Sequence, residues 1–226
     1  MKYTIHRALA LKKTTEDRIR TAIQEAKFID IRQGKRGTID GVPVEKVEQQ
    51  IKSSYQKIEQ LISNYITLKN AILSSNAGIP KDTVVIRVGV QGKEYTMAEL
   101  ISTSDEIYGT RKHPDAFYSL LLSRMKKAYA DTVSKINRQH DIVENDIRQY
   151  LERSTASDKG MSKEEIQQRS EMFHEDRDYV MVDPLNLKEK IQQLEAEIQA
   201  FRTDADATMS EQNALTVIEV DLTAVD

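Results

Sequence analysis

The feature that most constrains this chain is an unbroken heptad pattern between Val44 and Ile72. Apolar side chains recur there at alternating spacings of three and four residues over about four heptads, which is the pattern of a coiled-coil seam. The seam consists of Val44, Val47, Ile51, Ser54, Ile58, Leu61, Tyr65, Leu68 and Ile72, of which only Ser54 is polar. Further apolar residues beside it predict a helix with at least two helical neighbours.

A second seam follows Asp183 and Pro184, a pair typical of an N-cap and a first helical residue. It consists of Leu187, Ile191, Leu194, Ile198, Phe201 and Ala205. Apolar periodicity also predicts an amphipathic helix over residues 4–29 and a long one that begins near Pro114. With only 8 Gly and 4 Pro in 226 residues, the chain is expected to be mainly α, an elongated antiparallel helical bundle or coiled coil.

The two seams should form the core of the monomer and extend into an interface between copies of the chain, so a homo-oligomer is expected. The candidate interface residues are Val47, Ile51, Ile58, Leu61, Tyr65, Leu68, Ile191, Leu194, Ile198 and Phe201. The basic stretch 111–127 and the acidic tail after Phe201 could pair subunits head to tail, although such charges are more commonly a solvated face.

Two segments alternate like β-strands within this helical pattern. Residues 83–96 contain the turn sequence GVQG and predict a hairpin, after which Thr96 and Glu99 are spaced as a capping box for a helix that begins close to Met97. Residues 215–222 predict a C-terminal strand. Because a lone hairpin is marginal in water, we expect the two to pair as a small β clip, and this structural reading is favoured over a binding loop.

The remaining stretches are expected to be irregular and exposed, within a single elongated helical domain over 1–226. Residues 30–46 collect three glycines and a proline, which indicates a loop or a small hairpin. Residues 155–178 are polar without helical periodicity and predict an exposed insertion with weak order, although a short turn around Ile166 fits the pattern. Residues 179–183 offer a few extended positions before the last helix.

Charge and composition limit the partners and the compartment. A net charge of −3 and a pI near 5.9 make nucleic acid an unlikely partner. The absence of cysteine excludes disulfides and thiolate metal sites and suits a reducing compartment. No secretory signal or membrane span is predicted, which favours a cytoplasmic protein, or a virion protein if the gene belongs to a phage.

Motifs for chemistry are weak, so we expect no enzyme, no catalytic residues, no cofactor and no metal ligands. Arg32, Lys35 and Arg36 on a glycine-rich loop could contact an anion, but a solvated loop explains them better. The segment FHEDRD, residues 173–178, is the best metal-like cluster and fits an exposed polar connection more readily. The four histidines His6, His113, His140 and His174 lie far apart in the sequence, so a zinc site would need distant residues to converge.

The order of parts resembles the septicolysin-like family of small bacterial helical proteins. The resemblance spans most of the chain and is specific at Asn76, over 92–100 (GKEYTMAEL) and over 183–194 (DPLNLKEKIQQL). It implies a helical fold with a hairpin, whereas the family name implies a cytolysin, and no site residue can be transferred.

The segments HRAL, AIQEAKFI and IKSSYQKIEQLI also resemble small helical structural proteins of phages of Gram-positive bacteria. Together these observations favour a non-enzymatic structural or assembly protein that contacts itself and other structural proteins, in the setting of a phage virion or its assembly. The alternatives are a membrane-active, cytolysin-like protein and a module that binds anions or nucleic acid.

Overall fold

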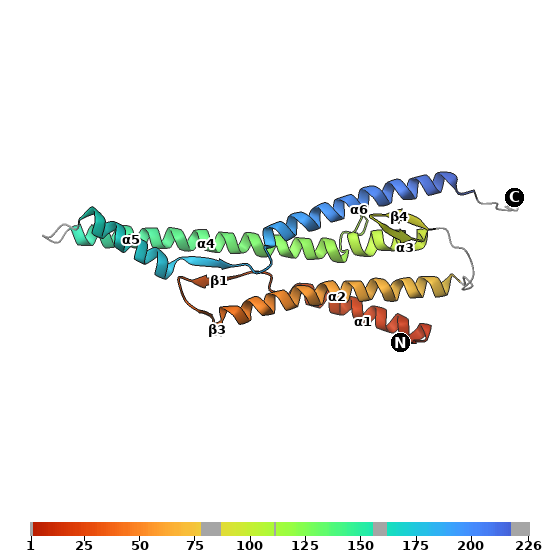
Figure 1. Cartoon of the computed structure of the whole chain (residues 1–226), viewed down its shortest axis with the longest axis horizontal. Coiled ribbons are helices and arrows are strands. Elements are labelled where there is room, and N and C mark those ends of the chain that lie inside the picture. The colour runs from red at the N-terminus through yellow and green to blue at the C-terminus, as the bar shows by residue number, and fades with distance from the viewer. Residues whose placement is uncertain (1, 78–86, 111, 156–161, 218–226) are drawn as a thin grey trace, which may run out of the picture. The chain divides into compact units, whose positions relative to one another are not determined.

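Helices dominate the computed structural model, which describes residues 2–77, 87–110, 112–155 and 162–217 (Figure 1). The α-helices are α1 (Ile5–Glu25), α2 (Val44–Asn76), α3 (Met97–Thr103), α4 (Phe117–Thr155), α5 (Lys163–Arg177) and α6 (Leu187–Leu215), and a π-helical turn, η1 (Ser104–Tyr108), continues α3. The strands are β1 (Asp30–Gln33), β2 (Thr38–Ile39), β3 (Val42–Pro43), β4 (Val88–Val90), β5 (Lys93–Tyr95) and β6 (Tyr179–Val182). The predicted class, mainly α with minor antiparallel strand pairs, is confirmed.

Contacts divide the chain into two compact units. The first unit comprises residues 1–17, 62–120 and 193–226, and the second comprises residues 18–61 and 121–192. Helices α1, α2, α4 and α6 each contribute residues to both units. The expected single elongated domain over 1–226 stays a prediction.

Both heptad seams form regular helices whose apolar side chains are mostly buried, which confirms their predicted place in the core of the chain. In α2, Ile51 and Ile58 are almost inaccessible to solvent, and in α6 every seam residue from Leu187 to Ala205 is buried. Of the ten candidate interface residues, only Leu61 and Leu68 are half-buried and the others are buried within one chain. Whether the seams extend into an interface between copies stays a prediction.

The core of the first unit is aromatic. The ring of Phe201 stacks on that of Tyr108 with centroids 3.8 Å apart, and it meets the edge of the Tyr95 ring at 6.2 Å. The Arg202 guanidinium donates a hydrogen bond of 2.8 Å to the backbone carbonyl of Tyr108. Gly109 follows with a φ of +83°, and a Cβ atom there would lie 2.7 Å from the Ser119 hydroxyl. The turn after η1 therefore needs glycine to pack against α4 and α6.

The hairpin predicted within 83–96 is present over its described part. Strand β4 pairs with β5 in antiparallel register, with Val88 opposite Tyr95, and the predicted capping box of Thr96 and Glu99 starts α3 at Met97. The C-terminal strand is not seen where it was expected to begin, because α6 continues to Leu215. Ala, Met, Glu and Gln dominate residues 205–215 and favour helix. Residues 83–86 and 218–222 lie outside the described residues.

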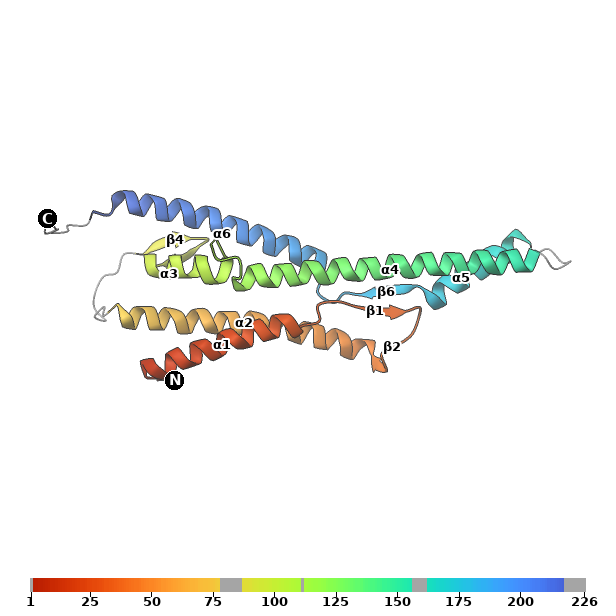
Figure 2. The same ribbon diagram turned by 180° about the vertical axis from the view of Figure 1, so that it is seen from behind.

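The glycine-rich stretch 30–46 forms strand pairs that local patterns only partly predict. Strands β2 and β3 make the expected small hairpin. Strand β1 pairs with β6 instead, with Asp30 opposite Val182 and Gln33 opposite Tyr179, and the two strands lie side by side in Figures 1 and 2. The apolar core of the second unit lies beside these strands and includes Ile39, Val47, Ile51 and Val182.

The polar insertion expected over 155–178 contains a helix, which corrects the expectation of weak order for its described part. Helix α5 begins after a complete capping box: the Ser162 hydroxyl accepts from the Glu165 N–H, and the Glu165 carboxylate accepts from the Ser162 N–H. These bonds satisfy two otherwise unpaired backbone donors, so the helix starts without an apolar stripe. Its exposure agrees with the prediction, since no residue of α5 is fully buried.

Candidate functional site

Four polar side chains meet where α5 lies along α4 in the second unit. His140 and Glu144 belong to α4, whereas His174 and Asp178 lie on the last turn of α5 and at its C-cap. A spacing of four residues places each histidine on the same helical face as its carboxylate. We call these four residues the histidine cluster.

The contacts within the histidine cluster join the two helices. The Oδ2 atom of Asp178 lies 2.9 Å from His174 Nδ1 and 3.3 Å from His140 Nδ1. The other ring nitrogen of His174, Nε2, lies 3.1 Å from the Glu144 carboxylate. The two imidazole rings stack with centroids 5.0 Å apart. Two nitrogens and one carboxylate oxygen, all within 4.8 Å of one another, therefore form a donor set that could hold a metal ion.

Asp178 is held in place by backbone contacts as well as by its helix. Its N–H donates to the His174 carbonyl at 3.0 Å, and its carbonyl accepts from the Gly34 N–H at 2.7 Å. Gly34 has a φ of +54°, and a Cβ atom there would lie 2.5 Å from the Glu175 carbonyl oxygen. Only glycine lets the end of β1 approach α5 this closely, so the loop fixes the backbone that carries the Asp178 carboxylate.

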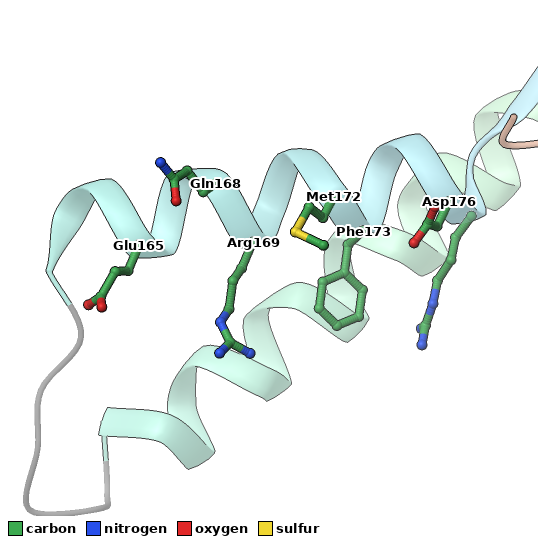
Figure 3. A pocket seen from close by; sticks show the side chains of 7 residues that line it. Glu165, Gln168, Arg169, Met172, Phe173 and Asp176 are labelled. Carbon is green, nitrogen blue, oxygen red and sulfur yellow. The ribbon is translucent and has the colours of Figure 1, made fainter.

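Aromatic and cationic side chains hold α5 against α4 next to the cluster. The Phe173 ring lies 5.6 Å from the Tyr150 ring of α4, and the Arg177 guanidinium lies 4.7 Å above Phe173. Figure 3 shows Arg169 and Phe173 extending from α5 toward α4, on the wall of an open pocket of about 660 Å³. Because Phe173 precedes His174 directly, this packing limits the positions that the imidazole can adopt.

The candidate anion contacts Arg32, Lys35 and Arg36 do not form one site. Arg32 is half-buried in β1, whereas Lys35 makes an ion pair of 2.6 Å with Glu175. Lys35 and Arg36 line a pocket of about 710 Å³ together with Arg177, Asp146 and Asp176. Lys35 and Arg177 are already paired with the carboxylates of Glu175 and Asp146.

Sequence reasoning missed the histidine cluster, because His140 and His174 were expected to stay apart. His174 and Asp178 belong to FHEDRD, which is exposed only in part: both side chains are half-buried. A signal was nevertheless present, since the chain contains His-x-x-x-Glu at residues 140–144 and His-x-x-x-Asp at residues 174–178. Two such pairs on helices that pack side by side can converge, but the sequence alone does not show that the helices pack.

The first unit contains a second polar cluster around η1. The Glu106 carboxylate accepts from Tyr65 at 2.5 Å, makes a close ion pair with the buried Lys69 and lies 3.9 Å from Lys12. Burial alone would raise the pKa of Glu106, but hydrogen bonds from Lys69 and Tyr65 outweigh it, so the pKa lies below its usual value. Burial lowers the pKa of Lys69, although the neighbouring Glu106 carboxylate acts to raise it. Such a cluster is most simply a structural ion pair that closes the core.

The shifted pKa of Glu106 predicts how stability depends on acid. The folded protein binds this proton more weakly than the unfolded chain, so the contribution of Glu106 is fully present above the unfolded pKa, about 4.3. It is lost as the pH falls through the lower folded pKa. The difference in unfolding free energy between the wild type and Glu106→Gln should therefore shrink as the pH falls from neutral through the unfolded pKa and then through the lower folded pKa. Urea unfolding of both proteins across this pH range measures the difference. Equal decreases of the unfolding free energy in the two proteins would contradict the prediction.

Comparisons of the chain with protein-family models, with curated proteins and with solved structures find no match. The resemblances to septicolysin-like and phage structural proteins therefore stay predictions. Among the described residues, no helix is both long and apolar enough to cross a bilayer.

Proposed function

We propose that this chain is a non-enzymatic structural or assembly protein that works through protein–protein contacts, first with further copies of itself. The observation that supports this is the uncovered end of the apolar stripe on α1. Ile19 and Ile23 are 0% and 1% exposed, whereas Ile5 and Leu9 are 39% and 47% exposed. Ile5 precedes Ile23 by eighteen residues, or five full turns, so the two share one helical face.

The chemistry of this surface favours a second copy as its occupant. Residues 5–13 of α1 carry Arg7, Lys12 and Lys13 and no acidic residue. The end of α6 has the opposite charge together with exposed apolar groups: Asp204, Asp206 and Glu211 are exposed, and Leu215 and Val217 are 68% and 88% exposed. Contact between α1 of one copy and α6 of the next would match apolar with apolar and basic with acidic groups.

Such a contact joins two different surfaces, so it would link copies head to tail into a ring or a filament. This type of assembly suits the virion or virion-assembly setting, in the cytoplasm or in the particle, that the resemblance to phage structural proteins implies. Other structural proteins of the same particle would be further partners. The membrane-active and anion-binding alternatives stay predictions.

Light scattering after size exclusion tests this proposal across a tenfold range of protein concentration and at two salt levels, with a chelator present. The wild type should form oligomers that weaken at high salt, because salt screens the charged contacts. Leu9→Ser and Arg7→Glu should shift the protein toward monomer, whereas Ile142→Ser, at an equally exposed apolar residue of α4, should not. A wild type that is monomeric throughout, or oligomers that resist both variants, would overturn the proposal.

A further inference from the structure

We propose that His140, His174 and Asp178 bind one divalent transition-metal ion, with Zn²⁺ as the representative ion, and that Glu144 orients His174 from outside the coordination sphere. The proposal concerns the α4–α5 hairpin of the second unit and does not depend on self-assembly. It rests on the placement of both ring nitrogens of His174, on the spacing of the donors and on the anchoring of Asp178.

Both ring nitrogens of His174 face carboxylates, at 2.9 Å from Asp178 and 3.1 Å from Glu144. A neutral imidazole has one N–H donor and one lone pair, so one of its nitrogens would direct a lone pair at a carboxylate oxygen. A metal ion between one nitrogen and its carboxylate removes this conflict, because the lone pair then binds the ion.

Two of the three donor spacings are close to those of a coordination sphere. Zinc bonds of about 2.0–2.2 Å place neighbouring nitrogen and oxygen ligands of a tetrahedral site about 3.3–3.6 Å apart. Asp178 Oδ2 lies 2.9 and 3.3 Å from the two Nδ1 atoms, and all three donors lie within 4.8 Å of one another. Small changes in side-chain torsion therefore suffice to bring the three atoms onto one ion.

Metal-bound histidines usually donate a hydrogen bond to a group outside the coordination sphere, and Glu144 is placed to accept it. With Nδ1 of His174 on the metal, Nε2 carries the proton and donates it to Glu144 at 3.1 Å, which fixes the ring and its tautomer. Asp178 is fixed by the Gly34 hydrogen bond, and its second oxygen, Oδ1, is buried without a hydrogen-bond partner among the described residues. The site is therefore organised before an ion arrives.

The donor types determine which ions the site selects. Two imidazoles and one carboxylate suit Zn²⁺, Ni²⁺ and Cu²⁺, whereas Mg²⁺ and Ca²⁺ prefer all-oxygen sites. Lys35 and Arg177 are paired elsewhere, Lys35 with Glu175 and Arg177 with Asp146, so these two cations do not compete for the carboxylates of the cluster. Three protein ligands leave a fourth position on the side of His140, whose side chain is 54% exposed. Water or a further protein ligand can take that position.

Isothermal titration of untagged, chelator-stripped full-length protein with Zn²⁺ tests the proposal, with Mg²⁺ as the comparison ion. One Zn²⁺ should bind per chain and raise the melting temperature, and Mg²⁺ should do neither. Co²⁺ in place of Zn²⁺ should give the visible absorption of a tetrahedral site. His174→Gln and Asp178→Asn should each weaken Zn²⁺ binding more than Glu144→Gln, for which about a 10–100-fold loss is expected.

A matched control comes from the first unit, where His113 and Asp105 form a lone histidine–carboxylate pair at 3.8 Å. His113→Ala should bind Zn²⁺ like the wild type. If His174→Gln or Asp178→Asn loses helicity, Zn²⁺ binding by His140→Ala tests the proposal instead, because the exposed His140 ring contributes least to packing. Absence of Zn²⁺ binding, or equal binding by His140→Ala, His174→Gln and the wild type, would overturn the proposal.

Discussion

Replacing Phe201 by alanine should destabilise the protein by about 3–5 kcal/mol, the usual cost of removing a buried phenylalanine. The ring is 1% exposed and lies against Tyr95 and Tyr108, so its loss leaves a cavity that these rings cannot easily fill. Both rings also lose an aromatic contact. The free energy of unfolding in guanidinium, followed by circular dichroism, measures the effect.

The control for this variant is Ile101→Ala. Ile101 belongs to the same unit and is 49% exposed, so its truncation should change stability by no more than about 0.5 kcal/mol. Phe201→Leu should lie between the two variants, since leucine refills much of the volume. Equal losses for Phe201→Ala and Ile101→Ala would show that the aromatic core does not stabilise the fold.

Gly34→Ala should cost about 2–5 kcal/mol, although it adds only one methyl group. A left-handed backbone costs a non-glycine residue about 1–2 kcal/mol. Overpacking adds a further ~1–3 kcal/mol, because the new Cβ would lie 2.5 Å from the Glu175 carbonyl oxygen and 2.6 Å from that of Asp176. Hydrogen exchange should show lost protection in β1 and at the end of α5, and Zn²⁺ binding should weaken as Asp178 moves.

Gly41 is a matched control for Gly34. It also has a positive φ, +79°, but no atom lies within 4 Å of the position where a Cβ would be added. Gly41→Ala should therefore lower the free energy of unfolding only by the cost of the left-handed backbone, about 1–2 kcal/mol. If both alanine variants lose the same stability, the close approach of Gly34 to α5 contributes nothing.

Local patterns predicted most of the helices because they depend on neighbouring residues. The seam beginning at Val44 became α2, and the capping box at Thr96 started α3 at the expected residue. Asp183 and Pro184 predicted the last helix but not its first residue: α6 begins at Leu187 rather than at Pro184, and the Asp183 carboxylate accepts from the Leu187 N–H. Ser162 and Glu165 have capping-box spacing, but α5 lacks the apolar periodicity that predicts the other helices, so the sequence pattern did not indicate it.

Long-range pairings could not be predicted in the same way. The pairing of β1 with β6 depends on how the helices between them fold back on one another. Neither four-residue strand has a sequence pattern that identifies the other as its partner. The histidine cluster has the same origin, since His140 and His174 meet only because α5 folds back along α4. Each half of the cluster could be predicted from its spacing, but the meeting of the halves could not.

The pairing of β1 with β6 also orders events in time as the protein is made. About 150 residues separate Asp30 from Val182, and at ribosomal speeds of about 5–20 residues per second their synthesis takes on the order of ten to thirty seconds. During that interval α1 and α2 can form from local contacts, whereas β1 has no partner strand to complete it. The Gly34 bond that holds Asp178 can form only after residue 178 has been made, so the histidine cluster assembles later than α1 and α2.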